Sequence, residues 1–244
     1  MAYYGIRKNK KESVMKTRNK CSRILVAVRV VFTILFMLAL LFVPAGTWKW
    51  PEAWIFIVFY STAAAFSVFW MKKKAPGLLK ERQTKKKDAK AWDKTFMRIY
   101  SLMLIFLLII PGWDAVRQGW SQVPLALKVA AFIGYLPALI FALWALIENS
   151  FASDVVRIQK DRGHTVCTTG PYRYVRHPMY VGVILIMLCF PLSLGSYYGL
   201  IPAFIIILLF FFRTAFEDRA LQEELPGYKE YASKVRYRLI PGIW

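Results

Sequence analysis

The chain has 244 residues, of which 57% are hydrophobic, and it carries a formal net charge of +20 at pH 7. A soluble domain has fewer apolar residues and a charge nearer balance, so this composition predicts an integral membrane protein with several spans. The basic residues cluster between apolar runs instead of covering one polar face, which argues against a nucleic-acid-binding domain and predicts no nucleic-acid partner.

Two apolar runs near the start of the chain predict the first pair of membrane helices. Residues 7–23 hold eight Lys or Arg and one acid, which predicts a basic cytosolic tail over residues 1–23. The run at residues 24–43 is longer than the core of a signal peptide, so we interpret it as a membrane span. Residues 53–71 form the second span, and the turn before it carries a predicted interfacial aromatic belt, consisting of Trp48, Trp50 and Trp54.

A basic connection and a short third span follow. Residues 72–98 carry eleven Lys or Arg and three acids, with Pro76 and Gly77 as helix breakers. We expect a cytosolic loop here that lies along anionic lipid headgroups. The third span, residues 96–110, has only about 15 residues and would require local thinning of the bilayer or burial within the bundle.

The remaining apolar runs predict three more spans. The fourth, residues 129–147, contains Pro137 as a predicted kink and ends at Glu148. A polar, basic segment leads from there into a tight hairpin of two apolar runs, residues 178–194 and 200–212. We find no internal repeat and no second soluble domain. The predicted fold class is therefore all-α, a multi-spanning bundle of about six membrane helices.

The distribution of charge predicts the orientation of this bundle. Of the 34 Lys and Arg residues, only Lys49, Arg117 and Lys128 fall on the side opposite the others. Positive residues are retained on the cytosolic side of a membrane, so both termini are predicted to be cytosolic. The membrane would be the cell membrane in a prokaryote and the endoplasmic reticulum in a eukaryote. The predicted organisation is a tail (1–23), four N-terminal helices with the basic loop (24–148) and a core (149–244).

The stretch GPYRYVRHPMYVG, residues 170–182, joins a polar segment to an apolar one and is the first candidate for a functional site. Pro178 suits the first turn of a helix, so a helix is predicted to begin beside His177 with its free amides exposed. The preceding turn brings basic and aromatic residues to the same place, namely Tyr172, Arg173, Tyr174 and Arg176. Alone, His177 could equally be a cap or a packed polar residue, and Tyr172 and Tyr180 could be interfacial anchors.

A second candidate lies at the end of the last apolar run, where Arg213 precedes Glu217 by one helical turn. One interpretation is an exposed salt bridge, which stabilises a helix by about 0.3–0.5 kcal/mol. The other is that the hairpin returns this pair to the His177 junction, because two helices joined by a short turn bring their outer ends together. An ionisable pair at that depth of a membrane protein then indicates a binding site.

Residues 149–244 contain several motifs in a fixed order. Arg176-His177-Pro178-x-Tyr180-x-Gly182 is preceded by His164-Thr165 and followed by Arg213-x-x-x-Glu217-Asp218-x-x-Leu221. Pro226-Gly227-Tyr228-x-x-Tyr231 and Ile240-Pro241 complete the ordered set. These motifs resemble the isoprenylcysteine carboxyl methyltransferase family and, more distantly, the phospholipid N-methyltransferases. Asp218 departs from the pattern, since the family usually has a second glutamate there.

The resemblance implies a cytosol-facing S-adenosyl-L-methionine site without a Rossmann domain, and no GxGxxG motif follows a strand here. It implies cofactor contacts by His164, Thr165, Val166, Cys167, Tyr172, His177, Pro178, Met179 and Tyr180, with Glu217 taking the amino group of the cofactor. Arg213 would hold the substrate carboxylate. Where the family has a further polar contact, this chain has Arg157. Cys21, Cys167 and Cys189 show no metal or disulfide spacing, so we expect reduced thiols and no metal.

The chemistry fits a carboxylate acceptor. A carboxylate is already ionised at neutral pH, so its methylation needs no general base, and an arginine can hold it in a two-pronged contact. The cofactor would enter from the cytosol and a lipophilic carboxylate, such as a prenylated cysteine, from the bilayer. Two alternatives stay open. A phospholipid amine methyltransferase would need a base where Arg213 lies, and a non-catalytic protein would bind anionic lipid through residues 72–98.

Overall fold

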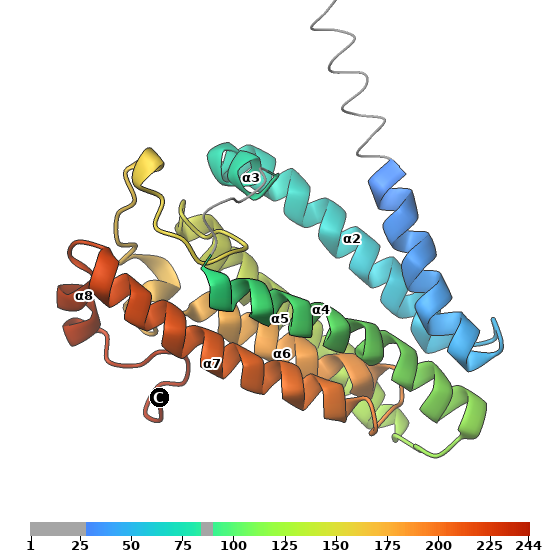
Figure 1. Ribbon diagram of the computed structural model, residues 1–244. Coiled ribbons are helices and arrows are strands. Elements are labelled where there is room, and N and C mark those ends of the chain that lie inside the picture. Colours follow the sequence, from blue (N-terminus) through green and yellow to red (C-terminus); the bar gives the residue numbers. More distant parts are fainter. Residues whose placement is uncertain (1–27, 84–89) are drawn as a thin grey trace, which may run out of the picture.

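The computed structural model describes residues 28–83 and 90–244 of the chain (Figure 1). The predicted tail of residues 1–23, Cys21 and part of the basic loop lie outside the described residues. Within the two described ranges every regular element is a helix, and five of the helices are long and apolar enough to cross a membrane. The predicted class, an all-α bundle of an integral membrane protein, is confirmed.

The first described helix, Val28–Ala45, and α2, Pro51–Lys74, form a hairpin at one side of the bundle (Figure 1). Pro51 occupies the first turn of α2, where its missing N–H group costs no hydrogen bond. Next to this turn, the ring of Phe42 packs against Trp48 and Trp54, with centroid distances of 4.8 and 4.9 Å. The tryptophans predicted as a belt therefore cluster at the end of the hairpin.

The basic connection is more helical than the sequence suggested. α2 continues to Lys74, the short helix α3 spans Pro76–Gln83, and α4 begins at Ala91. The prediction of a loop over residues 72–98 is therefore wrong for most of its described part. Pro76 ends one helix but also starts the next, because proline is tolerated in a first turn.

The third span is long, so the prediction of a 15-residue span at residues 96–110 is also wrong. α4, Ala91–Pro111, continues into the π-helix η1, Gly112–Gln118, and together they make one apolar helix of 28 residues. η1 contains Asp114, one helical turn before its end. This residue is buried, and its carboxylate accepts hydrogen bonds from the hydroxyls of Ser121 and Ser196, which removes the cost of burying it.

The rest of the bundle consists of α5, Leu125–Glu148, α6, Pro178–Ser193, and α7, Leu200–Glu224. α6 has 16 residues and is the short apolar helix of the described chain. α7 continues beyond the apolar run of residues 200–212 through Arg213 and Glu217, as their helical spacing predicted, and ends at Glu224. The sixth predicted span therefore extends well past the membrane-length apolar run.

Helix packing places the ends of α6 and α7 together. α7 packs against both α4 and α6, and α6 packs closely on α5 (Figure 1). A Cβ added at Gly182 would lie 2.8 Å from the carbonyl oxygen of Ala138 on α5, so only glycine permits this approach. The short helices η2, Lys160–Arg162, and η3, Gly170–Arg173, precede α6, and α8, Tyr228–Lys234, follows α7. These elements gather at one end of the bundle.

Candidate active site

The candidate site lies at the end of the bundle where α6 begins. His177 is the N-cap of α6 and Pro178 is its first residue, as the sequence predicted. The backbone amides of Arg176 and His177 donate to the carbonyls of Tyr237 and Arg238, both at 2.9 Å. The segment that follows α8 therefore lies directly against the start of α6.

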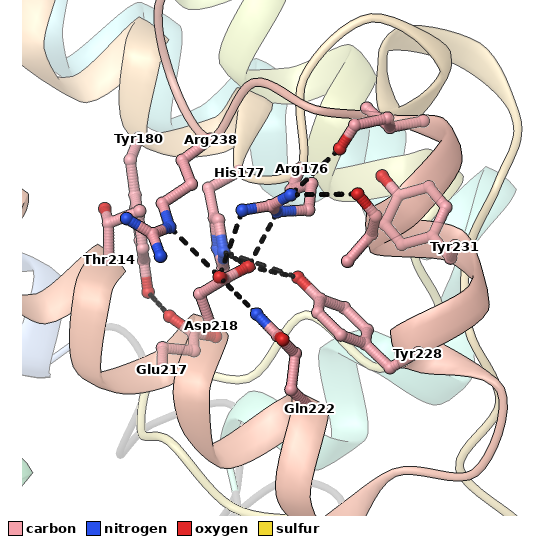
Figure 2. Close-up of polar contacts among 12 residues, drawn as sticks. Arg176, His177, Tyr180, Thr214, Glu217, Asp218, Gln222, Tyr228, Tyr231 and Arg238 are labelled. Carbon is pink, nitrogen blue, oxygen red and sulfur yellow. Dashed lines mark hydrogen bonds and ion pairs between the residues drawn. The ribbon is translucent and has the colours of Figure 1, made fainter. Parts of the chain in front are cut away.

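The carboxylate of Asp218, on α7, is the centre of a buried polar network (Figure 2). Arg176 Nη2 and Arg238 Nε donate to its Oδ2 atom at 3.1 and 3.0 Å. Gln222 Nε2 donates to the same oxygen at 2.8 Å, and the hydroxyl of Tyr228 donates to Oδ1 at 3.0 Å. Hydrogen bonds between charged groups are the strong kind, so Asp218 joins α7 rigidly to α8 and to the residue that precedes His177.

His177 is part of the same network. Its Nε2 atom lies 3.4 Å from Asp218 Oδ1, and its ring lies nearly parallel to that of Tyr180 with a centroid distance of 5.9 Å. The sequence allowed two roles for His177, a packed polar residue or a member of a binding site. In the structure His177 is a packed polar residue, because it is buried against Asp218, and it also lines a cavity beside this network.

Arg176 fixes α8 in place. Its Nη1 atom donates to three carbonyls at the C-terminal end of α8, those of Ala232, Val235 and Arg236. A cation is favourable at that end of a helix. Arg176 also lines the cavity, whereas Arg173 and Tyr174, which the sequence placed at the same site, are exposed and do not line it.

A cavity lies beside this network, between α6, α7, α8 and the segment that precedes α6. Nine of the ten residues predicted to contact the cofactor line this cavity, namely His164, Thr165, Val166, Cys167, Tyr172, His177, Met179, Tyr180 and Glu217. Pro178 is the exception, because it is buried as the first residue of α6. The fold therefore brings three separate predicted segments to one concave surface.

Sequence reasoning missed two walls of the cavity. One wall is the segment after α5, in which the sequence had singled out only Arg157. Its other residues are Asn149, Phe151, Ala152, Ser153, Val155 and Val156. The other combines α8 with the end of α7, through Tyr228, Tyr231, Leu221 and Leu225. The Pro-Gly-Tyr-x-x-Tyr motif at residues 226–231 contains both tyrosines and could have identified this second wall.

The first wall is held from outside by α3. Arg157 forms an ion pair with Glu81 of α3 at 2.9 Å, with the two side chains only 11% and 10% exposed. Arg82 Nη1 donates to the carbonyl of Ala152 at 3.1 Å. Arg157 therefore has a partner of its own, so its place in the cavity wall does not show that it contacts a ligand.

His164 and three tyrosines line the cavity as neutral groups. Burial lowers the pKa of His164, and the charge of Arg162 lowers it further. The His164 ring stacks on Phe151 with a centroid distance of 4.6 Å. Burial raises the pKa of the tyrosine hydroxyls, which stay protonated, at Tyr172, Tyr228 and Tyr231. The cavity thus offers aromatic faces and hydrogen-bond donors.

Glu217 supplies a carboxylate to this cavity. It is partly exposed, and its side chain accepts a hydrogen bond from the hydroxyl of Tyr180. The prediction that the hairpin returns Glu217 to the His177 junction is therefore confirmed. The alternative, an exposed salt bridge between Glu217 and Arg213, is not observed, because Arg213 pairs with another residue.

Arg213 is buried and forms an ion pair with Asp93, at the start of α4, with Nε and Oδ1 3.2 Å apart. Its Nη2 atom donates to the carbonyl of Asp154 at 2.9 Å. The guanidinium lies over the rings of Phe96 and Tyr180, 4.6 and 5.6 Å from their centroids. Arg213 therefore lies behind Tyr180 and is not among the residues that line the cavity. Asp93 gave no signal in the sequence analysis.

Comparison with known protein families agrees with this geometry. Residues 128–226 match the model of the family PEMT, phospholipid methyltransferase. The match includes α6, all ten predicted cofactor residues and the pair Arg213 and Glu217, and it indicates a membrane methyltransferase. No curated protein matches the chain.

Proposed function

We propose that this chain, of which residues 128–226 match the phospholipid methyltransferase family, transfers a methyl group from S-adenosyl-L-methionine to a lipophilic acceptor in the membrane. The observation that carries the proposal is the cavity, in which His164, Tyr180 and Glu217 meet from three segments of the chain. These segments converge at the end of an apolar helix bundle.

The residues of the cavity fit this cofactor. S-adenosyl-L-methionine supplies a methyl group bound to a positively charged sulfur atom, together with an ammonium, a carboxylate and an adenine ring. The carboxylate of Glu217 suits the ammonium group. Aromatic faces stabilise a cation at short range, and Tyr172, Tyr180 and Tyr231 line the cavity. The neutral ring of His164, stacked on Phe151, provides a flat surface of the kind that an adenine ring packs on.

The first candidate for the acceptor is a carboxylate, such as that of a prenylated cysteine or a similar lipophilic acid. Arg213 supports this choice, since it is a cation that lies 5.6 Å from the ring centroid of Tyr180, and Tyr180 lines the cavity. The acceptor oxygen is ionised at neutral pH, so the protein has to orient it and exclude water, and no proton transfer is required.

The second candidate is the amine of a phospholipid. Two findings favour it, the description of the matched family and the carboxylate of Asp93 next to Arg213. An ammonium must lose a proton before it can accept a methyl group, and a carboxylate at this position could receive it. Transfer of a labelled methyl group to S-farnesylcysteine and to phosphatidylethanolamine, in parallel, separates the candidates.

The variant Arg213→Lys sharpens this experiment. Lysine keeps the charge but cannot hold Asp93 and the Asp154 carbonyl together, so transfer to a carboxylate should fall at least tenfold while cofactor binding stays close to wild type. Arg219→Lys, on an exposed turn of the same helix, is the matched control and should be fully active. Full activity of Arg213→Lys on the acid would refute the role of Arg213, and transfer to the phospholipid alone would establish the second candidate.

We also propose that the cavity opens to the cytosol and that anionic lipids contact the basic segment around α3. The support is the distribution of Lys and Arg along the chain, since three lysines end α2 and two basic residues lie in the last turn of α3. Negative headgroups on the cytosolic leaflet attract such clusters. On this proposal the cofactor reaches the cavity from the cytosol, and the acceptor remains in the bilayer.

A further inference from the structure

The ion pair between Asp93 and Arg213 joins the matched region to a helix outside it. Arg213 lies within residues 128–226, whereas Asp93 lies in the first turn of α4. Both side chains are buried, with 0% of the Asp93 side chain and 6% of the Arg213 side chain exposed. The N-terminal half of the chain therefore supplies the counter-ion for the cation next to the cavity.

Asp93 faces one edge of the Arg213 guanidinium. Its Oδ1 atom lies 3.2 Å from Nε, and its Oδ2 atom lies 3.5 Å from Nη2, which also donates to the Asp154 carbonyl. The rings of Phe96 and Tyr180 lie over the guanidinium. Nη1 makes no hydrogen bond with any residue in the described part of the chain. Nη1 is thus the guanidinium nitrogen with neither a hydrogen bond nor an ion pair in the described part of the chain. An acceptor that reaches Arg213, which does not line the cofactor cavity, would meet this one nitrogen, so the two-pronged contact expected from the sequence is not available in this arrangement.

The pair is poorly built as a purely structural contact. Asp93 Oδ1 and Arg213 Nε are 3.2 Å apart but misaligned, so each is a buried atom without a hydrogen-bond partner among the described residues. Arg176 Nε in the Asp218 network is also without such a partner, but there both carboxylate oxygens accept hydrogen bonds, whereas Asp93 Oδ1 accepts none from any described residue. Buried ion pairs with incomplete hydrogen bonds contribute little to stability, and apolar residues of similar volume often replace them without loss. The pair lies next to Tyr180, which lines the cavity and donates a hydrogen bond to Glu217. This position suits a role in the reaction.

The charge balance of methyl transfer gives that role a physical reason. A carboxylate oxygen donates an electron pair to the methyl carbon, the carbon–sulfur bond breaks, and its electron pair stays on sulfur. An anion and a cation thereby become two neutral products, and no proton moves. An unpaired arginine would stabilise the reacting carboxylate more than the transition state, in which the negative charge is fading. Such binding slows the reaction, because only interactions that strengthen in the transition state accelerate it.

We propose that Asp93 is a positioning residue that neutralises Arg213, so that the acceptor carboxylate is oriented by Nη1 but held weakly enough to react. This inference rests on the carboxylate acceptor of the proposed function. Asp93 also accepts the backbone N–H of Val156 at 2.8 Å, and Val156 lines the cavity. The side chain of Asp93 therefore connects Arg213, the cation proposed to orient the acceptor, to the wall of the cofactor cavity.

The decisive variant is Asp93→Asn, which has the same shape and keeps an oxygen for the Val156 amide while removing the charge. Binding of N-acetyl-S-farnesylcysteine and of its methyl ester is measured in detergent without the cofactor, and kinetics with the acid follow. Wild type should bind acid and ester within about threefold, because Arg213 is neutralised. Asp93→Asn should prefer the acid by at least about tenfold and should lower both KM and kcat for the acid by about tenfold.

Two further variants show whether the effect acts through Arg213. The double variant Asp93→Asn with Arg213→Gln should lose the preference for the acid. Asp114→Asn changes another buried aspartate at the opposite end of the same continuous helix and should leave the ratio of acid to ester affinity at the wild-type value. A mainly structural Asp93 would instead lower kcat and stability without lowering KM.

Each outcome decides the proposal. Three results would overturn it. Wild type could bind the acid more than about tenfold more tightly than the ester. The ratio of acid to ester affinity could be unchanged in Asp93→Asn, or the preference for the acid could persist in the double variant. If Asp93→Asn does not fold, the ratio of acid to ester affinity in wild type still shows whether Arg213 is neutralised. If wild type transfers no methyl group to the acid, the carboxylate acceptor of the proposed function fails, while the binding ratios still report on whether Asp93 neutralises Arg213.

Discussion

Replacing Asp218 by asparagine should destabilise the protein strongly, because one fully buried carboxylate compensates the charges of two arginines. Arg176 has 8% of its side chain exposed and would keep its charge without a counter-ion. Breaking a buried ion pair by removing one partner costs about 3–5 kcal/mol. At roughly 2–4 °C per kcal/mol for a chain of this size, the melting temperature in detergent should fall by roughly 6–20 °C.

The matched control for Asp218→Asn is Glu223→Gln on the same helix. Glu223 pairs with Arg219, and the two side chains are 59% and 78% exposed, so this loss should cost about 0.3–0.5 kcal/mol and at most about 2 °C. Thermal unfolding of both variants, followed by a thiol-reactive dye or by near-ultraviolet circular dichroism, makes the comparison. If Asp218→Asn melted within about 2 °C of wild type, the network in Figure 2 would not hold the site together in the way argued above.

Three further expectations follow from the site and the bundle. Glu217→Gln should weaken binding of S-adenosylhomocysteine in calorimetry by about 10- to 100-fold, since a hydrogen bond to a charged group contributes about 1.5–3 kcal/mol; unchanged affinity in a folded variant would remove Glu217 from the site. Single cysteines at Trp120 and Lys234, in a background without native cysteines, should be labelled from opposite sides of the membrane, and labelling from one side would refute the predicted orientation. Because burial and Arg162 lower the pKa of His164, the unfolded chain takes up a proton at a higher pH than the folded one, so the melting temperature should fall as the pH drops below about 6.5. His164→Gln should show a smaller fall, and an identical pH dependence would assign it to other groups.

The cofactor side of the site could be predicted from the sequence because its residues lie in short ordered motifs. Pro178 marks the start of α6, and the helical spacing places Glu217 one turn beyond Arg213. The return of α7 to the start of α6 follows from the short turn between them. These local rules placed the start of α6 and the pair Arg213 and Glu217. The nine predicted residues that line one cavity came instead from the resemblance of the motifs to a known family.

The acceptor side could not be predicted, because its partners are distant in sequence and carry no local signal. Asp93 lies 120 residues before Arg213 and looks like one more charge in a basic segment. Asp218 appeared only as a departure from a family pattern, although the structure makes it the centre of the buried network. Asp114 lies beyond the apolar run predicted as the third span, and its burial in η1 depends on hydrogen bonds from Ser121 and Ser196 that no local pattern shows.

The length of α6 has a consequence for how a lipid could be methylated. Sixteen residues rise about 24 Å, whereas the hydrocarbon layer of a typical bilayer is about 30 Å thick. When the Ser193 end of α6 reaches one membrane interface, the His177 end therefore lies several ångströms short of the opposite interface. The cavity at that end then lies close to the acyl chains. α7, with 25 residues, continues past this level, and its residue Asp218 lies beside His177 at the end of α6. A chain anchored in the bilayer can then present its head to the cavity without being drawn into water, which would cost about 0.8 kcal/mol for each exposed methylene group.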